Sequence, residues 1–165
     1  MMGTFSVAHG DLLDYATDGH FDVIIHGCNC FCTMGGGIAA SISARFPAAL
    51  KVDRGTTMGD KSKLGSYTSA TIDIDSTTKT GRTAFVIVNA YTQYMCSPTK
   101  EVPIPCDYDA IDKVMTRINH DFAGKSIGLP QLGAGLAGGD WTKIEEIIRK
   151  RLTACDVTIV LFQAS

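Results

Sequence analysis

The stretch 24–39, IIHGCNCFCTMGGGIA, gathers residue types that can bind a ligand or catalyse a reaction. It holds three cysteines at alternate positions, one histidine, one asparagine and three consecutive glycines. These residues suit three kinds of chemistry: metal binding by thiolates, attack by a cysteine nucleophile, and anion binding by backbone amides. The spacing of the residues has to decide among the three.

The cysteine spacing argues against a metal site. Cys28, Cys30 and Cys32 follow a C-x-C-x-C pattern, whereas structural zinc sites use two separated C-x₂₋₄-C pairs. No such pair is formed by the remaining cysteines, Cys96, Cys106 and Cys155. We therefore predict neither a metal site nor a cofactor. Cys32 remains a candidate nucleophile if a cation or helix N-terminus lies nearby, and Cys28 is more typical of a small buried residue.

Four polar residues have both a structural and a functional interpretation. His26 ends an apolar run and is either a hydrogen-bonded structural residue or a general acid or base. Asn29 either forms a turn or hydrogen-bonds ligand hydroxyls. Asp11, in HGDLLD (9–14), either caps a short helix or accepts a hydrogen bond from a ligand amino group. Asp140 either caps the last helix, which we favour, or orients a water molecule.

Two glycine-rich segments follow predicted strands and open predicted helices: MGGGIA (34–39) and LGAGLAGGDW (132–141). Glycine lets the backbone approach a ligand closely, and amides at a helix N-terminus favour an anion. Two such loops at the carboxyl edge of one sheet predict a clasp for a diphosphate. The alternative is that the glycines only make tight turns. GAGLAG (133–138) precedes the last helix, so it is not the dinucleotide fingerprint, and the chain has no P-loop signature.

Alternating apolar strands and amphipathic helices predict the elements that position these residues. Strands are predicted at 4–9, 23–25, 65–74, 83–91, 126–130 and 157–162. Helices are predicted at 36–46, 107–122 and 140–155, with Pro47 stopping or bending the first. Polar or proline-rich loops are predicted at 51–63 and 92–106. This order indicates an α/β fold with a mixed, largely parallel sheet and helices on both faces.

The composition narrows the class of protein. A chain of 165 residues that is 45% hydrophobic and 19% charged predicts one globular domain, residues 1–165. A net charge of −2 gives no general nucleic-acid footprint. We find no membrane-span signal and no signal peptide, so we expect a cytoplasmic protein with free thiols, acting as a monomer.

Three segments, in this order, resemble a macrodomain: HGDLL (9–13), VIIHGCNCFCTMGGGIA (23–39) and IGLPQLGAGLAGGDW (127–141). The resemblance is closest to the branch that contains ADP-ribose-1″-phosphate phosphatases. Hydrolases of the terminal ADP-ribose–glutamate linkage are similar in the MGGGIA and GAGL elements. The resemblance covers most of the chain and implies a three-layer α/β/α sandwich that binds ADP-ribose at the carboxyl edge of the sheet.

The resemblance also implies roles for individual residues. Asp11 would hold the adenine amino group, Leu12 would supply a backbone amide, and Phe162 would pack on the adenine. Asn29 would contact the distal ribose, and His26 matches a histidine of the phosphatase branch. The loop residues that would surround the distal ribose and the diphosphate are Gly35, Gly36, Gly37, Ile38, Gly133, Ala134, Gly135, Leu136 and Ala137.

The sequence departs from related macrodomains in three places, of which the first two concern the glutamate-linked hydrolases. No lysine occurs in VIVNAYTQY (86–94), where those enzymes use one. Their acidic residue in the second loop falls at Ala137, and only Asp140 lies nearby. GCNC (27–30) replaces the common NAAN loop and keeps only its second asparagine.

Three hypotheses follow from the sequence. The first is an ADP-ribose-1″-phosphate phosphatase or related ADP-ribosyl hydrolase, with His26 as general acid or base and Asn29 and Asp140 positioning water. The second is a module that binds ADP-ribose without chemistry. The third and weakest is a redox or metal sensor built on the C-x-C-x-C run.

Overall fold

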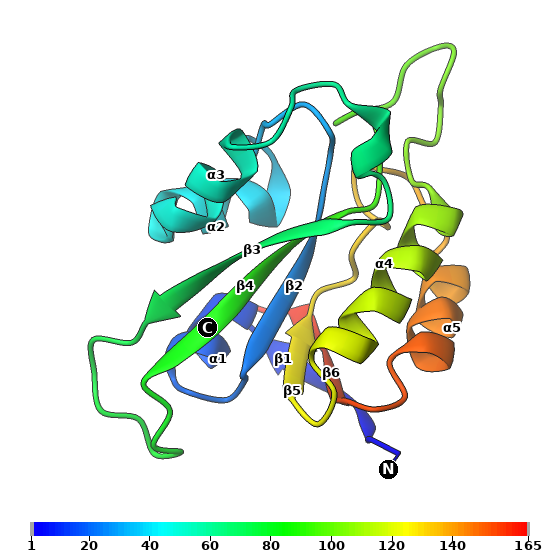
Figure 1. Cartoon of the computed structure of the whole chain (residues 1–165). Helices are drawn as coiled ribbons and strands as arrows, with labels where there is room; N and C mark the ends of the chain where they lie inside the picture. Colours follow the sequence, from blue (N-terminus) through cyan, green and yellow to red (C-terminus); the bar gives the residue numbers. More distant parts are fainter. Residues whose placement is uncertain (1, 165) are drawn as a thin grey trace.

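A six-stranded sheet lies between two layers of helices in the computed structural model, which describes residues 2–164 (Figure 1). The strand order is β1-β6-β5-β2-β4-β3, and every neighbouring pair is parallel except β3 with β4. The elements in chain order are β1 (Phe5–Gly10), α1 (Leu12–Thr17), β2 (Val23–Cys28), α2 (Gly37–Arg45), α3 (Pro47–Arg54), the 3₁₀ helix η1 (Lys61–Lys63), β3 (Tyr67–Asp73), β4 (Ala84–Tyr91), α4 (Tyr108–Asp121), β5 (Ser126–Leu129), α5 (Trp141–Arg151) and β6 (Asp156–Phe162).

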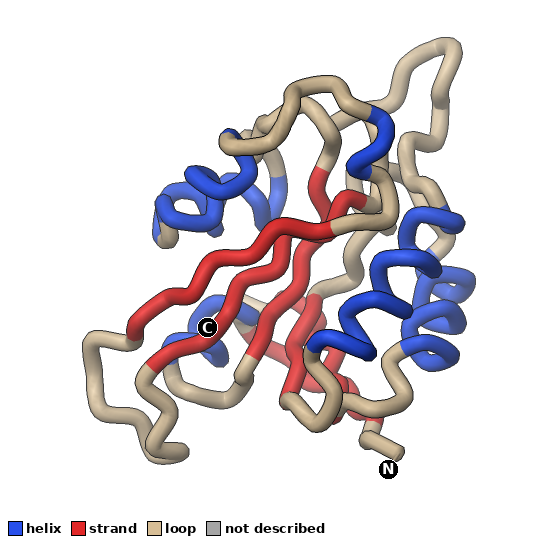
Figure 2. The backbone as a smooth tube through the Cα atoms, in the orientation of Figure 1, coloured by secondary structure: helices blue, strands red, loops and turns tan. Residues whose placement is uncertain are grey.

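Helices cover both faces of the sheet, as Figure 2 shows by the blue helices on either side of the red strands. Ile24 of β2 packs in the core under α1, α2 and α3, together with Ile42 and Ala49. Val23 and Ile25 point the other way and pack in the core under α4 and α5. A parallel strand buried on both faces reads as a continuous apolar run, which is why residues 23–25 gave a strand signal. The predicted α/β/α fold class is thus confirmed.

The edges of the sheet also follow the sequence pattern. β3 pairs only with β4, in the register Tyr67↔Ala90 to Asp73↔Ala84, and most of its residues are partly or fully exposed. An outer antiparallel strand has one face in solvent, so it alternates in polarity. The alternation at 65–74 therefore predicted this strand correctly.

The prediction of a loose segment at 51–63 is wrong in part. Helix α3 begins at Pro47 and continues to Arg54, and η1 follows at Lys61–Lys63. Proline suits the first position of a helix because its missing N–H would be unpaired there. Pro47 therefore ends α2 and also starts α3. The predicted loop at 92–106 is confirmed, and it projects from the body of the molecule (Figure 2).

Within residues 2–164, none of the helices combines the length and the apolar character that a bilayer crossing requires.

Candidate functional site

Two adjoining cavities lie where the parallel strands end. The first has a volume of about 380 Å³ and the second about 630 Å³. Both are lined by Gly37, Ile38 and Pro130, so together they form one cleft. Pro130 directly follows β5, which places the cleft at the carboxyl edge of the sheet, where open α/β sheets bind ligands.

The first cavity is built from the ends of β1 and β6. These strands are neighbours in parallel register, and the pair Gly10↔Phe162 brings their ends together. Asp11 caps α1 through Oδ1, which accepts hydrogen bonds from Leu13 N at 2.9 Å and Asp14 N at 3.1 Å. Its second oxygen, Oδ2, accepts no hydrogen bond in the described chain. Asp11 therefore serves as the helix cap and still presents one carboxylate oxygen.

The other predicted residues of this cavity also line it. Leu12 lies beside Asp11 and is buried, whereas Phe162, at the end of the neighbouring strand β6, is 73% exposed. A mostly exposed aromatic ring beside a cavity can stack on a planar ligand without any change in the fold. The structure thus brings Asp11, Leu12 and Phe162 together as the sequence predicted.

The first glycine loop, Gly35 to Gly37, borders the second cavity with its backbone. A Cβ atom added at Gly35, Gly36 or Gly37 would meet no heavy atom of the protein within 4 Å. Gly37 has a φ of +56°, a backbone conformation that favours glycine. Gly36 has an extended backbone with φ −132°, which other residues can also adopt. Internal packing therefore does not explain Gly35 and Gly36. The open space above them fits close approach by a ligand.

The second glycine loop mixes structural and cleft-facing positions. A Cβ atom at Gly139 would lie 2.6 Å from Gly133 O, so packing requires that glycine. Gly133 and Gly138 have φ values of +77° and +72°, which favour glycine. Gly135, in contrast, faces open space and lines the second cavity.

Four of the five residues predicted in this loop line the second cavity: Gly133, Gly135, Leu136 and Ala137. Ala134 does not line it. Instead, its side chain packs against the core beneath α4 and α5. Ala134 is therefore a correction to the predicted site.

His26 does not face the cleft, so its expected role as acid or base on a ligand has no geometric basis here. Its side chain is 1% exposed, and Nε2 lies 2.6 Å from Asn89 Oδ1. Asn89 Nδ2 donates to Ala49 O and Thr68 Oγ1, which fixes the amide so that Oδ1 accepts from His26. Burial lowers the pKa of His26 to about 4, although the Asn89 hydrogen bond raises it. The ring is neutral at ordinary pH.

Asn29 lies beside the cleft, as the sequence predicted, but both polar atoms of its side chain already form hydrogen bonds within the protein. It lines the second cavity and is 8% exposed. Its Nδ2 donates to Thr33 O at 3.0 Å and to Thr33 Oγ1 at 2.9 Å. Its Oδ1 accepts from Phe31 N at 2.8 Å. The turn-forming interpretation of Asn29 therefore describes its side chain in this structure.

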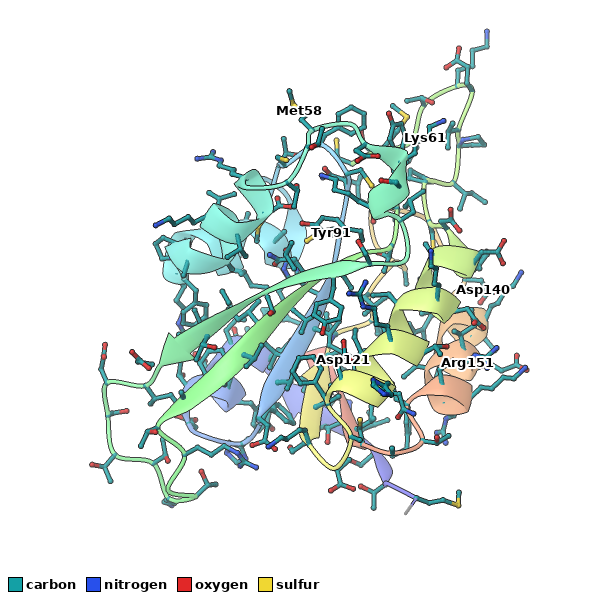
Figure 3. All side chains as sticks on the ribbon, viewed as in Figure 1. Met58, Lys61, Tyr91, Asp121, Asp140 and Arg151 are labelled. Atoms are coloured by element: carbon teal, nitrogen blue, oxygen red, sulfur yellow. The ribbon has the colours of Figure 1, made fainter. Side chains whose placement is uncertain are left out.

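Asp140 lies outside both cavities, which corrects its proposed role in positioning water. Its Oδ1 accepts from Thr142 N at 3.0 Å and caps α5, as we favoured. Its backbone N donates to the hydroxyl of Tyr108 at 2.9 Å. Figure 3 shows Asp140 beside α4 and α5, away from Tyr91 at the end of β4.

The cysteines of the opening stretch are free thiols with different surroundings. Cys28 and Cys30 are buried, and burial raises the pKa of both thiols, to about 11 for Cys30. The Sγ atom of Cys32 lies 3.8 Å from Lys63 Nζ and 3.3 Å from Thr56 Oγ1, away from the glycine loops. In residues 2–164, no three histidine, cysteine or acidic side chains are grouped as a metal site would need.

Several cavity residues were not predicted from the sequence. Ser41 lines the first cavity, one helical turn after Gly37, so helical spacing could have found it. Gln93 and Cys96 line the second cavity just beyond β4. The rule that ligands bind at strand ends points to the segment after β4, but it does not say which side chain of that segment turns inward. Of the residues that line either cavity, Asp11 is the sole carboxylate, and none is lysine, arginine or histidine within the part of the chain described.

Solved macrodomains share this fold. The macrodomain of Mycobacterium tuberculosis DarG matches with a TM-score of 0.65 at 24% identity, over 96% of this chain and 97% of that one. Thermosipho africanus DarTG, solved in complex with ADP-ribose, matches with a TM-score of 0.66 at 18% identity, over 96% of this chain and 41% of that one. The fold of this chain is therefore that of a macrodomain.

One phage protein is similar in sequence. An uncharacterised 17.5 kDa protein from the tk-vs intergenic region of Enterobacteria phage T4 is 34% identical over 142 residues. The match covers 83% of this chain and 84% of the phage protein. The chain therefore belongs to the same protein family as the phage T4 protein. No protein-family model matches the chain.

Proposed function

We propose that this protein binds ADP-ribose, with the adenosine in the first cavity and the diphosphate and distal ribose in the second. The observation that carries the proposal is the space above Gly35, Gly36 and Gly135. These glycines face a cavity, and no contact within the protein requires the lack of a side chain at any of them. Backbone that must approach a ligand closely is one of the few remaining reasons for glycine there.

The dimensions and chemistry of the cleft suit this ligand. The two cavities, of about 380 and 630 Å³, fall in the usual range for small-molecule sites. The free Oδ2 of Asp11 can accept a hydrogen bond from an exocyclic amino group, and Phe162 offers a ring for stacking. Amides at the start of α2 favour the diphosphate charge. The ADP-ribose complex of the T. africanus protein, which has the same fold, supports this choice of ligand.

Calorimetric titration tests the binding proposal. We expect ADP-ribose to bind more tightly than AMP, because AMP lacks the groups that would fill the second cavity. Asp11→Asn should weaken both ligands, since it replaces the carboxylate beside the base. Absence of heat with ADP-ribose, from protein that melts cooperatively, would refute the proposal.

A second candidate is hydrolysis of the phosphate from ADP-ribose 1″-phosphate, and the resemblance of residues 23–39 to the phosphatase branch favours it. Because His26 and Asp140 lie outside the cleft, the reacting water would be held by other groups of the second cavity. Phosphate release from ADP-ribose 1″-phosphate tests this activity. The same assay on acetylated, glutamate-linked and nucleic-acid-linked ADP-ribose tests other ADP-ribosyl hydrolyses. Binding without turnover of any of them would favour a non-catalytic module.

A further inference from the structure

Gln93 is the second residue after the end of β4 and lines the second cavity, yet it is only 8% exposed. Its backbone is held on two sides. It forms a bridge with Cys106, and its carbonyl oxygen accepts a weak hydrogen bond from Cys30 Sγ at 3.6 Å. A side chain on so constrained a backbone has a fixed starting point beside the cavity.

The amide of Gln93 can have only one orientation. Nε2 donates to Met95 O at 2.8 Å and, over a longer distance of 3.5 Å, to Cys96 O. Turning the amide over would place Oε1 against these two carbonyl oxygens, which cannot donate a hydrogen bond. Oε1 must therefore point away from the loop.

The carbonyl oxygen Oε1 is available to a ligand. Within residues 2–164, it accepts no hydrogen bond. The fully buried side-chain atoms without a hydrogen-bond partner in this part of the chain are Asp53 Oδ2 and Thr92 Oγ1, so Oε1 is not fully buried. Gln93 lines the second cavity, so that cavity is the space that its accessible Oε1 can reach. The neighbouring amide of Asn29 is different, because both of its polar atoms are already bonded within the turn.

We propose that Gln93 is a specificity-determining residue whose Oε1 accepts a hydrogen bond from a hydroxyl group of the distal sugar. This assignment rests on the proposed binding of ADP-ribose. A fixed acceptor increases the affinity for a ligand that carries a hydroxyl donor beyond the diphosphate. It does not increase the affinity for a ligand that ends at the diphosphate. Gln93 thus sets the preference for ADP-ribose over ADP.

Affinities of ADP-ribose and ADP, measured by calorimetry on wild type and Gln93→Met, test this assignment. The methionine side chain has a similar volume and no acceptor oxygen. We expect the ADP-ribose affinity to fall roughly three- to tenfold, as for loss of one neutral hydrogen bond. The ADP affinity should stay unchanged. Gln163→Met makes the same substitution at an exposed residue outside both cavities and serves as the matched control.

Other outcomes separate this assignment from the proposed function. Equal losses for ADP and ADP-ribose would mean that Gln93 only shapes the loop and would overturn the assignment, as would no loss at all. Failure of wild type to bind ADP-ribose would overturn the proposed function itself. If Gln93→Met does not fold, wild type can be titrated with ADP-ribose whose distal hydroxyls are methylated. Undiminished affinity for that ligand would also overturn the assignment.

Discussion

Acidification should destabilise this protein through His26, and the size of the effect follows from its burial. The pKa of His26 is about 4 in the folded protein, against an ordinary value of 6.5. The unfolded chain therefore takes up a proton at a pH where the folded protein does not. The stability that His26 contributes is complete above pH 6.5 and is lost as the pH falls towards 4. A difference of this size corresponds to about 3 kcal/mol.

Urea unfolding at a series of pH values across this window measures the effect. His26→Gln removes the titrating group, so the difference in unfolding free energy between wild type and variant isolates its contribution. That difference should shrink by about 3 kcal/mol on acidification. His120→Gln makes the same substitution at a side chain that is 91% exposed, and serves as the control. A difference between wild type and His26→Gln that stays constant across the window would refute the reasoning.

Three substitutions test the remaining features of the cleft. Gly35→Val should leave the melting temperature nearly unchanged, because its Cβ meets no protein atom within 4 Å. It should weaken ADP-ribose binding by roughly tenfold or more in calorimetry, about 1.4 kcal/mol. Gly139→Ala should lower the unfolding free energy by about 1–3 kcal/mol in urea, because its Cβ would lie 2.6 Å from Gly133 O, whereas Gly135→Ala in the same loop should not. Asp140→Ala should lower the unfolding free energy by about 1 kcal/mol, because α5 loses its N-cap, and should leave the ADP-ribose affinity unchanged. A large loss of affinity would contradict the position of Asp140 outside the cleft.

The strands, the longer helices and the glycine loops could be predicted from the sequence because their signals are local. The apolar run at residues 23–25 indicates a strand buried on both faces. Glycines between a strand and a helix indicate a turn at the carboxyl edge of the sheet. The expectation that Asp11 and Phe162 share a site came instead from the resemblance to macrodomains, and the pairing of β1 with β6 does bring these residues together. The inferences from local signals needed no knowledge of how the layers pack.

The position of His26 depends on packing that the sequence did not reveal. Strand alternation places His26 on the same face of β2 as Ile24. It does not say whether a helix covers that face as far along the strand as His26. The cover comes from α3, whose Ala49 O accepts from the Asn89 amide that also binds His26. Helix α3 was missing from the predicted elements, so the sequence could not decide between the structural and the catalytic interpretation of His26.

Gln93 was missed for a related reason. The segment after β4 is rich in proline and polar residues, and it indicates a loop without indicating which side chain turns inward. The inward position depends on carbonyl groups of Met95 and Cys96, two and three residues along the chain. Such hydrogen bonds depend on the path of the loop, which residue types alone do not determine.

The place of β6 between β1 and β5 has a consequence for synthesis of the protein on the ribosome. β6 is the final strand in chain order, and β1, the earliest, has no other partner in the sheet. The part of the first cavity at Gly10 and Asp11 is therefore translated long before the part at Val160 and Phe162. A nascent chain that lacks β6 has an incomplete first cavity, so a ligand that fills this cavity could stabilise the protein only after β6 has joined the sheet.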